Sequence, residues 1–226
     1  LVASSIGKSL GCESPNYLIK GITEFNLLTG GKTILLACLC AGISVIFCIM
    51  LHSFGKVFKT FSSNSYERVF FGGTVILCIT LILGTTRYSG TGIEVIASAI
   101  GGTARNSDFF WKMLFTAITL ACGYKGGEII PSFFVGATFG CVIAPVLGLS
   151  SSLGAAIGMV SVFCGVTNCP IASLLIALEL FGKAPILYFL LAIAISYMLS
   201  GYYSLYKTQI IAVSKYKNEY VDKKTH

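Results

Sequence analysis

The chain has 226 residues and a formal net charge of +7, and 55% of its residues are apolar against 11% charged. Soluble domains carry about 25% charged residues, and the mean hydropathy of this chain is +0.84. So few charges cannot cover a globular surface. The composition therefore excludes a water-soluble domain and indicates that lipid surrounds most of the chain.

The apolar segments, taken in order, predict an all-α, polytopic membrane protein with broken helices. A helix needs about 20 apolar residues to cross the hydrocarbon; residues 33–52 meet that length, whereas 69–84 are shorter. A polar stretch from Lys56 to Arg68 separates these two segments, and 92–102 are too short to cross. The later apolar segments are 109–122, 131–147, 153–180 and 185–200. Trp111 and Lys112 suit a start of the first of these at the membrane interface.

Two breaks interrupt the later segments at apparent membrane depth: GYKGGEIIP at 123–131 and CGVTNCPIAS at 164–173. Lipid cannot hydrogen-bond free backbone groups, so such breaks persist only inside protein or beside a water-filled cavity. Transporters form their substrate sites from discontinuous helices of this kind. We expect Thr167 and Asn168 to satisfy the backbone that Pro170 frees, and we place the substrate site at the breaks.

The break before Pro131 favours an anion site. Proline suits the first helical position, because its missing N–H would have no partner there. The backbone N–H groups of Glu128, Ile129 and Ile130 then lie at the start of a helix, whose partial positive charge and free donors bind anions. Gly126 and Gly127 would allow a tight turn and close approach of the ion. The alternative is an ordinary helix that begins with proline after a glycine-rich loop.

Three further polar side chains, of which the two acids are expected at membrane depth, need an explanation. A carboxylate at a helix start caps it favourably, but an ionised Glu128 inside the bilayer is costly and would repel an anion. Protonation relieves both penalties, so Glu128 is a candidate proton carrier. The Tyr206 phenol could donate to an anion, or it could belong to an aromatic belt with its neighbours. Glu179 is better explained by helix packing.

Patterns typical of enzymes and metal sites are missing. Gly31-Lys32-Thr33 lacks the glycine that a phosphate-binding loop needs at position 26, where Asn26 stands. The two histidines are His52 and His226, with no hydrolase or zinc motif around them. Most of the nine cysteines lie in apolar segments without a CxxC pair, as expected of small apolar side chains. We therefore expect no catalysis, no metal and no cofactor.

Lysines crowd the last twenty residues, directly after an apolar segment: Lys207, Lys215, Lys217, Lys223 and Lys224. Positive charges beside membrane spans favour the cytoplasmic side, which predicts a cytoplasmic C-terminus. They are expected to contact lipid headgroups rather than nucleic acid. The chain opens on Leu1 with no initiator methionine or signal peptide, so we expect part of the functional protein to lie upstream.

Three blocks in the same order and spacing resemble the second half of the CLC chloride channels and proton-coupled antiporters. They are GYKGGEIIPSFFVGATFG, SVFCGVTNCPIASLLIALELFG and GYYSLYKTQI. The resemblance covers nearly the whole chain and implies the second of two inverted repeats, in a homodimer with one pore per subunit. It divides the chain into a loop and helix end at 1–31, a transmembrane domain at 32–206 and a Lys-rich tail at 207–226.

The resemblance also implies residue roles. In that family the loop before a helix-starting proline supplies amides to the anion, here those of Glu128, Ile129 and Ile130, and a tyrosine hydroxyl, here that of Tyr206, binds the central anion. Chloride-transporting members usually have an aromatic residue at Ile129 and an apolar one at Glu128. GGE followed by two residues and Pro131 looks instead like the fluoride/proton antiporter branch. That branch often has threonine at Ile130, however, and this hydroxyl is absent.

The sequence thus predicts an integral protein of a bacterial plasma membrane that exchanges fluoride or chloride for protons. The partners implied are a halide, protons, membrane lipid, a second copy and the missing first repeat, which would carry the external gating glutamate. A passive chloride channel of the same fold and a membrane accessory subunit that does not transport remain as alternatives.

Overall fold

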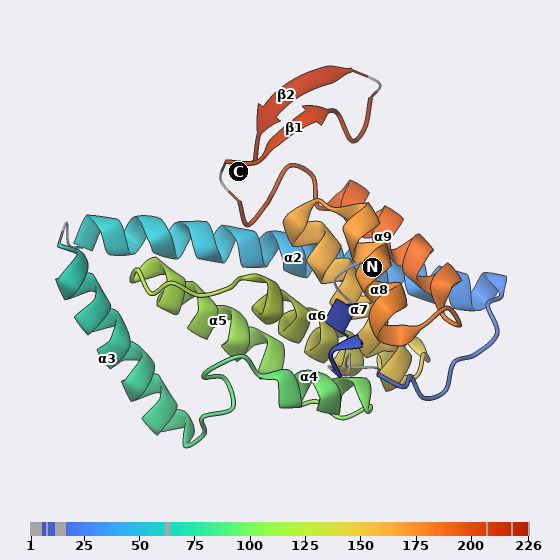
Figure 1. Ribbon diagram of the computed structural model, residues 1–226, viewed down its shortest axis with the longest axis horizontal. Helices are drawn as coiled ribbons and strands as arrows, with labels where there is room; N and C mark the ends of the chain where they lie inside the picture. Colours follow the sequence, from blue (N-terminus) through green and yellow to red (C-terminus); the bar gives the residue numbers. More distant parts are fainter. Residues whose placement is uncertain are drawn as a thin grey trace.

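The computed structural model describes residues 6–7, 9–11, 17–61, 64–206, 208–217 and 219–225; Lys207 and His226, named above, lie outside them. The described part is mostly helical, as the apolar segments predicted. Figure 1 shows a layer of packed helices from which a small two-stranded hairpin stands off at the C-terminal end. The elements in chain order are α2 (Leu27–Phe61), α3 (Ser65–Leu83), α4 (Ile93–Ile100), α5 (Asp108–Ala121), α6 (Ile129–Ile143), the 3₁₀ turn η1 (Ala144–Leu147), α7 (Ser151–Thr167), α8 (Pro170–Phe181), α9 (Ile186–Leu199), β1 (Ile210–Val213) and β2 (Tyr220–Lys224).

The first long helix extends beyond the predicted span 33–52 at both ends, from Leu27 to Phe61. Lys56 and Lys59 were expected in a polar loop, but α2 continues through both to Phe61. Lysine is a good helix former, and Lys59 in the last turn also suits the negative end of the helix dipole. At 35 residues, α2 is about 50 Å long. It therefore tilts or extends beyond a bilayer core about 30 Å thick.

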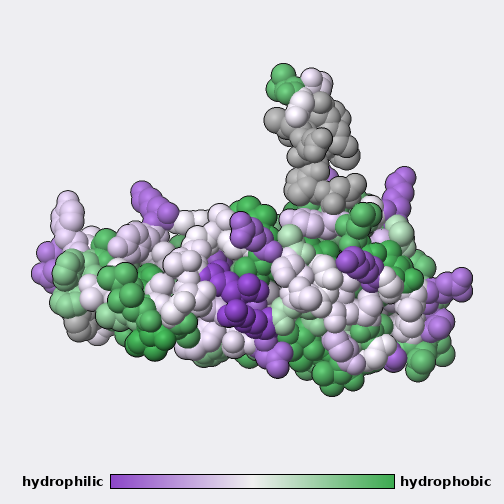
Figure 2. Space-filling view, turned by 90° about the horizontal axis from the view of Figure 1, so that it is seen from below, coloured by the Kyte–Doolittle hydropathy of each residue, from purple (hydrophilic) through white to green (hydrophobic). Residues whose placement is uncertain are grey.

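The outer surface is apolar, as a lipid environment requires. Among the described residues, three helical stretches are long and apolar enough to cross a membrane, namely Leu27–Thr60, Ser65–Leu83 and Ile129–Leu147. Leu81 and Ile82 on α3 are 72% and 83% exposed, which would be costly in water. Figure 2 shows one face on which broad hydrophobic areas flank a narrower hydrophilic patch.

The core lies where α2 packs against α5, α7 and α9, and α6 against α7. The break predicted within 153–180 is real: α7 ends at Asn168, whose left-handed backbone (φ 57°) closes the helix, and α8 starts at Pro170. We had expected the Asn168 side chain to satisfy the backbone that Pro170 frees. Instead, it donates to the Tyr203 carbonyl at 2.9 Å. The junction between the end of α7 and the start of α8 is thus fixed against the segment that follows α9.

Four glycines let α6 and α7 come into backbone contact. A Cβ at Gly140 would lie 2.1 Å from the Gly154 carbonyl oxygen, and one at Gly136 would lie 2.4 Å from that of Gly158. Contacts below 3 Å do not occur between real atoms of this kind, so no larger residue fits without moving a helix. This contact fixes α6, and hence its N-terminus, against α7.

We expect Gly140→Ala to destabilise the protein by about 1–3 kcal/mol, the usual cost of overpacking. Thermal unfolding in detergent measures the change. Gly42→Ala is the matched control, because Gly42 lies within α2 and a Cβ there would meet nothing within 4 Å. Equal stability of the two variants would contradict the tight contact between α6 and α7.

Candidate anion site

The start of α6 presents backbone donors without intrahelical partners. The helix begins at Ile129 with Glu128 as its N-cap. Pro131 is therefore the third helical residue, whereas we had expected it to be the first. The expectation failed because the whole first turn lacks intrahelical acceptors, and proline is tolerated anywhere in it. The first bond of the helix runs from the Ser132 N–H to the Glu128 carbonyl, at 3.2 Å.

Two amides at this end remain available. Among the described residues, none accepts a hydrogen bond from the N–H of Ile129 or Ile130. Both N–H groups belong to the positive end of the α6 dipole. Ile129 is 42% exposed, whereas Pro131 is buried. The described part of the chain therefore holds two fixed donors at an open surface, which suits an anion.

The preceding loop is open rather than tightly turned at its two central glycines. Gly126 and Gly127 were expected to supply unusual backbone angles, but the glycine of this loop with a positive φ is Gly123, at +103°. A Cβ at Gly127 would meet nothing within 4 Å. The open space beside Gly127, rather than a tight turn, therefore gives a ligand access to the backbone of this loop.

Glu128 lies at the same helix start, and its carboxylate does not cap α6, because the helix has no side-chain capping hydrogen bond. The side chain is half-buried. Burial and, second to it, the charge of the Glu128 carboxylate raise the pKa of the Tyr206 phenol above its usual value. Glu128 and Tyr206 are therefore close enough to interact electrostatically, although 78 positions separate them in the chain.

Tyr206 lies in the loop after α9, 40% exposed. Leu205 N–H donates to the Val166 carbonyl at 2.9 Å, which holds this loop to the end of α7. Within the described part of the chain, the Tyr206 hydroxyl has no hydrogen-bond partner. A tyrosine phenol is protonated at neutral pH, so the hydroxyl remains a donor. The Glu128 charge, which acts on the Tyr206 phenol, is thus the contact that links the predicted tyrosine to the start of α6.

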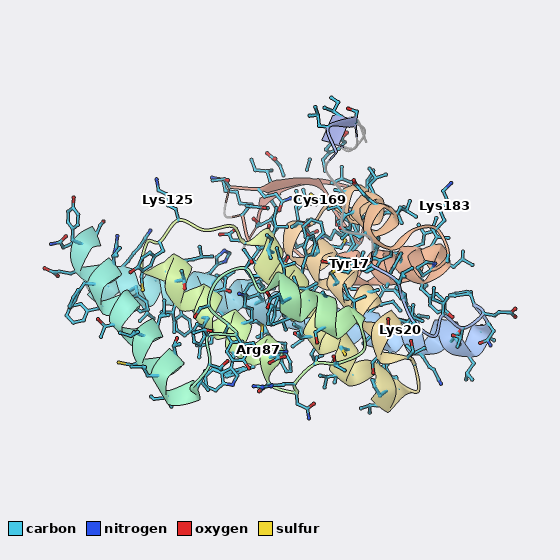
Figure 3. The ribbon with its side chains drawn as sticks, turned by 60° about the horizontal axis from the view of Figure 1, so that its bottom comes forward. Tyr17, Lys20, Arg87, Lys125, Cys169 and Lys183 are labelled. Carbon is cyan, nitrogen blue, oxygen red and sulfur yellow. The ribbon has the colours of Figure 1, made fainter. Side chains whose placement is uncertain are left out.

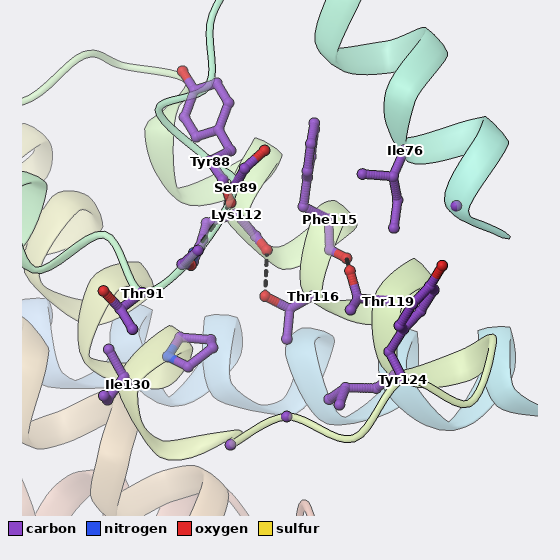
Figure 4. A pocket seen from close by; sticks show the side chains of 16 residues that line it. Ile76, Tyr88, Ser89, Thr91, Lys112, Phe115, Thr116, Thr119, Tyr124 and Ile130 are labelled. Atoms are coloured by element: carbon purple, nitrogen blue, oxygen red, sulfur yellow. Dashed lines mark hydrogen bonds between the residues drawn. The ribbon is translucent and has the colours of Figure 1, made fainter. Parts of the chain in front are cut away.

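A cavity of about 480 Å³ lies beside the loop that precedes α6. Gly126, Gly127, Ile130 and Pro131 line it, but Glu128, Ile129 and Tyr206 do not. Figure 4 shows its remaining residues, which come from α3, α5, the segment before α4 and, with Tyr124, the loop after α5. The cavity therefore reaches the start of α6 through Ile130 and Pro131.

Sequence analysis missed the role of the charged residues on α5. Asp108 is buried and accepts hydrogen bonds from the Arg87 guanidinium (2.9 Å) and the Tyr88 hydroxyl (2.8 Å). Arg87 is labelled in Figure 3. Lys112, expected at the membrane interface, is 2% exposed and donates to the carbonyl oxygens of Tyr88 (3.2 Å) and Gly90 (2.6 Å). Its ammonium lines the cavity. A charge within an apolar helix was the signal that could have indicated burial.

Comparisons with known proteins agree on one family. Residues 1–201 match the family model described as "Voltage gated chloride channel". The "Chloride/fluoride channel protein" of Pseudomonas syringae pv. tomato (strain ATCC BAA-871 / DC3000) is 32% identical over 227 residues, covering 96% of this chain and 49% of the relative.

A solved structure, described as the "Crystal structure of a CLC-type fluoride/proton antiporter", resembles the chain with a TM-score of 0.86 and 27% identity. The match covers 90% of this chain and 52% of the solved one. The chain therefore spans about half the length of the relatives that it matches.

If Tyr206 donates to a bound anion, Tyr206→Phe should weaken halide binding. A hydrogen bond to a charged group contributes about 1.5–3 kcal/mol, which corresponds to about ten- to hundredfold in affinity. Titration calorimetry with fluoride and with chloride measures the loss. Tyr66→Phe is the control, since Tyr66 is 87% exposed on α3. Unchanged affinity in Tyr206→Phe would remove the phenol from the site.

Proposed function

The chain belongs to the voltage-gated chloride channel family, and from this premise we propose that it forms one half of a proton-coupled halide transporter in a bacterial plasma membrane. One observation supports the proposal: within the described part of the chain, the N–H groups of Ile129 and Ile130 have no acceptor, and the Tyr206 hydroxyl has no hydrogen-bond partner. The ligand that suits such donors is an anion.

The donors replace the water that a halide loses on entering the site. Amide and phenol protons make charge-assisted hydrogen bonds to an anion, which are stronger than bonds between neutral groups. The α6 dipole adds a favourable field at its N-terminus. No cationic side chain is needed, so the anion is not trapped by a full opposite charge and can leave again.

Glu128 couples the anion to protons in this proposal. An ionised carboxylate at the start of α6 repels an anion that is bound to the neighbouring amides, whereas a protonated one does not. Halide binding therefore favours proton uptake by Glu128, and halide release favours proton loss. The absence of a side-chain capping bond from Glu128 to α6 supports this role over simple helix capping.

Fluoride is the favoured halide. The solved relative is described as a fluoride/proton antiporter, and the bacterial one as a chloride/fluoride channel protein. A carboxylate at 128 and an aliphatic side chain at Ile129 follow the fluoride branch, as stated above. The complete transporter would add the first repeat and its gating glutamate, pair with a second copy, and keep the C-terminus in the cytoplasm.

Replacing Glu128 with Gln tests the coupling. We expect Glu128→Gln in liposomes to retain halide movement down its gradient and to lose most of the linked proton flux. The reason is that the glutamine amide does not bind or release a proton near neutral pH. A pH-sensitive dye and a halide electrode record the two fluxes together. Glu179→Gln, an equivalent change on the exposed face of α8, should leave the ratio intact.

Unaltered coupling in Glu128→Gln would exclude this side chain as the proton carrier. A reversal potential that ignores an imposed proton gradient would instead indicate the passive channel. Release of neither halide by the complete protein would favour an accessory subunit.

A further inference from the structure

The loop that carries Tyr206 is held by residues that follow it in the chain. The Tyr206 N–H donates to the Ser204 hydroxyl at 3.1 Å, and the Tyr206 carbonyl accepts from the Thr225 hydroxyl at 2.8 Å. Thr225 directly follows β2, which pairs antiparallel with β1. The C-terminal hairpin therefore returns the chain to the backbone of Tyr206.

Gln209 joins this loop to α7. Its side-chain amide donates to the Thr167 carbonyl at 3.0 Å and accepts from the Ser204 hydroxyl at 2.6 Å. The Val166 carbonyl is the alternative, longer acceptor for the single Ser204 proton, at 3.3 Å. These acceptors are the last carbonyls of α7, which have no partner within their own helix. The end of α7 is thus the anchor for the tyrosine loop.

Lys215, just after β1, brings a charge to the same place. Its ammonium donates to the Asn168 side-chain oxygen, to the Tyr197 carbonyl at 2.8 Å and to the Ser200 hydroxyl at 3.1 Å. It also lies 4.2 Å from the centre of the Tyr197 ring. Asn168 closes α7, while Tyr197 and Ser200 close α9. One cation therefore binds the negative ends of two helices, where a positive charge is favourable.

The charge on Lys215 is present at neutral pH. Burial lowers the pKa of the Lys215 ammonium to about 8, so most of it is protonated and all three of its donors can be used. It has no carboxylate partner in the described part of the chain, where the salt bridge found joins Arg87 to Asp108. The helix ends and the Tyr197 ring are what stabilise this charge.

We propose that Lys215 is a positioning residue for the anion site, which ties the ends of α7 and α9 together and so holds the loop that presents the Tyr206 phenol. The link runs through Asn168, whose side chain accepts from Lys215 and donates to the Tyr203 carbonyl, three residues before Tyr206. This proposal rests on the proposed function, in which the Tyr206 hydroxyl binds the anion.

The physical effect is preorganisation. Tyr206 makes no side-chain hydrogen bond to another described residue, so only its backbone contacts fix where the phenol points. A binding group contributes fully only if its supporting contacts hold it within about 0.5 Å of the productive position. Without the ammonium, the α7 and α9 ends separate more easily, and the phenol samples positions that do not reach the anion.

The test is a double-mutant cycle of Lys215→Met with Tyr206→Phe, read as halide affinity by calorimetry in the complete protein. We expect Lys215→Met to weaken binding by about tenfold, and to have little further effect when the hydroxyl is already absent. Such coupling is typical of residues that act together, whereas independent effects add. Lys217→Met removes the same charge from an exposed position of the hairpin and is the control. Lys215→Arg should restore part of the affinity.

Hydrogen exchange of the Leu205 amide gives a second readout that does not depend on halides. It should speed up in Lys215→Met, and also in Thr225→Val, which removes the other link without changing the charge and remains informative if Lys215→Met does not fold. Unchanged exchange in both variants would show that neither Lys215 nor Thr225 holds the loop of Tyr206, and would overturn the proposal. Additive losses of affinity would show that Lys215 acts apart from Tyr206. If exchange speeds up but the wild type binds no halide, these contacts do hold the loop. The proposed function then fails, and the positioning role that rests on it fails as well.

Discussion

The backbone N–H groups at the start of α6, which have no acceptor among the described residues, are the constraint on which the proposed anion site depends. Lipid offers no acceptor, and a cationic or polar neighbour that filled such a site permanently would exclude a transported ion. The proposal therefore requires that the amides of Ile129 and Ile130 are held rigidly in an opening that a ligand can reach. Everything that fixes α6 contributes to the site, even when it lies far from the amides.

Two kinds of contact provide this rigidity at opposite ends of the helices. Gly140 and Gly154 let the backbones of α6 and α7 touch, which fixes the direction of the α6 dipole. At the other end of α7, Asn168 and Lys215 fasten the loop of Tyr206. α7 is thus the common support for both donors, and it is buried along nearly its whole length.

Local patterns predicted the local features. The apolar segments 109–122 and 185–200 match α5 and α9 within one residue at each end, because membrane helices are read from hydropathy alone. The match over residues 1–201 confirms the resemblance to the CLC family drawn from three sequence blocks. The position of Pro131 within the first turn was wrong, since nothing in the sequence distinguishes the first helical residue from the third.

Long-range contacts could not be predicted in this way. Lys215 appeared only as one of several tail lysines, yet it binds Asn168, 47 positions away. Lys112 was assigned to the interface, but its ammonium is enclosed by the carbonyls of a segment that precedes α5. In both cases the partners are backbone oxygens or a helix cap, which leave no mark in the residue types of a single sequence.

Nuclear magnetic resonance of the ¹⁵N-labelled complete protein in bilayers tests the central claim most directly. We predict that the amide signals of Ile129 and Ile130 shift in a saturable way as fluoride or chloride is added, and do not shift with a bulky anion such as gluconate at the same ionic strength. Amide signals that ignore both halides, while other parts of the protein respond, would contradict an anion site at the start of α6.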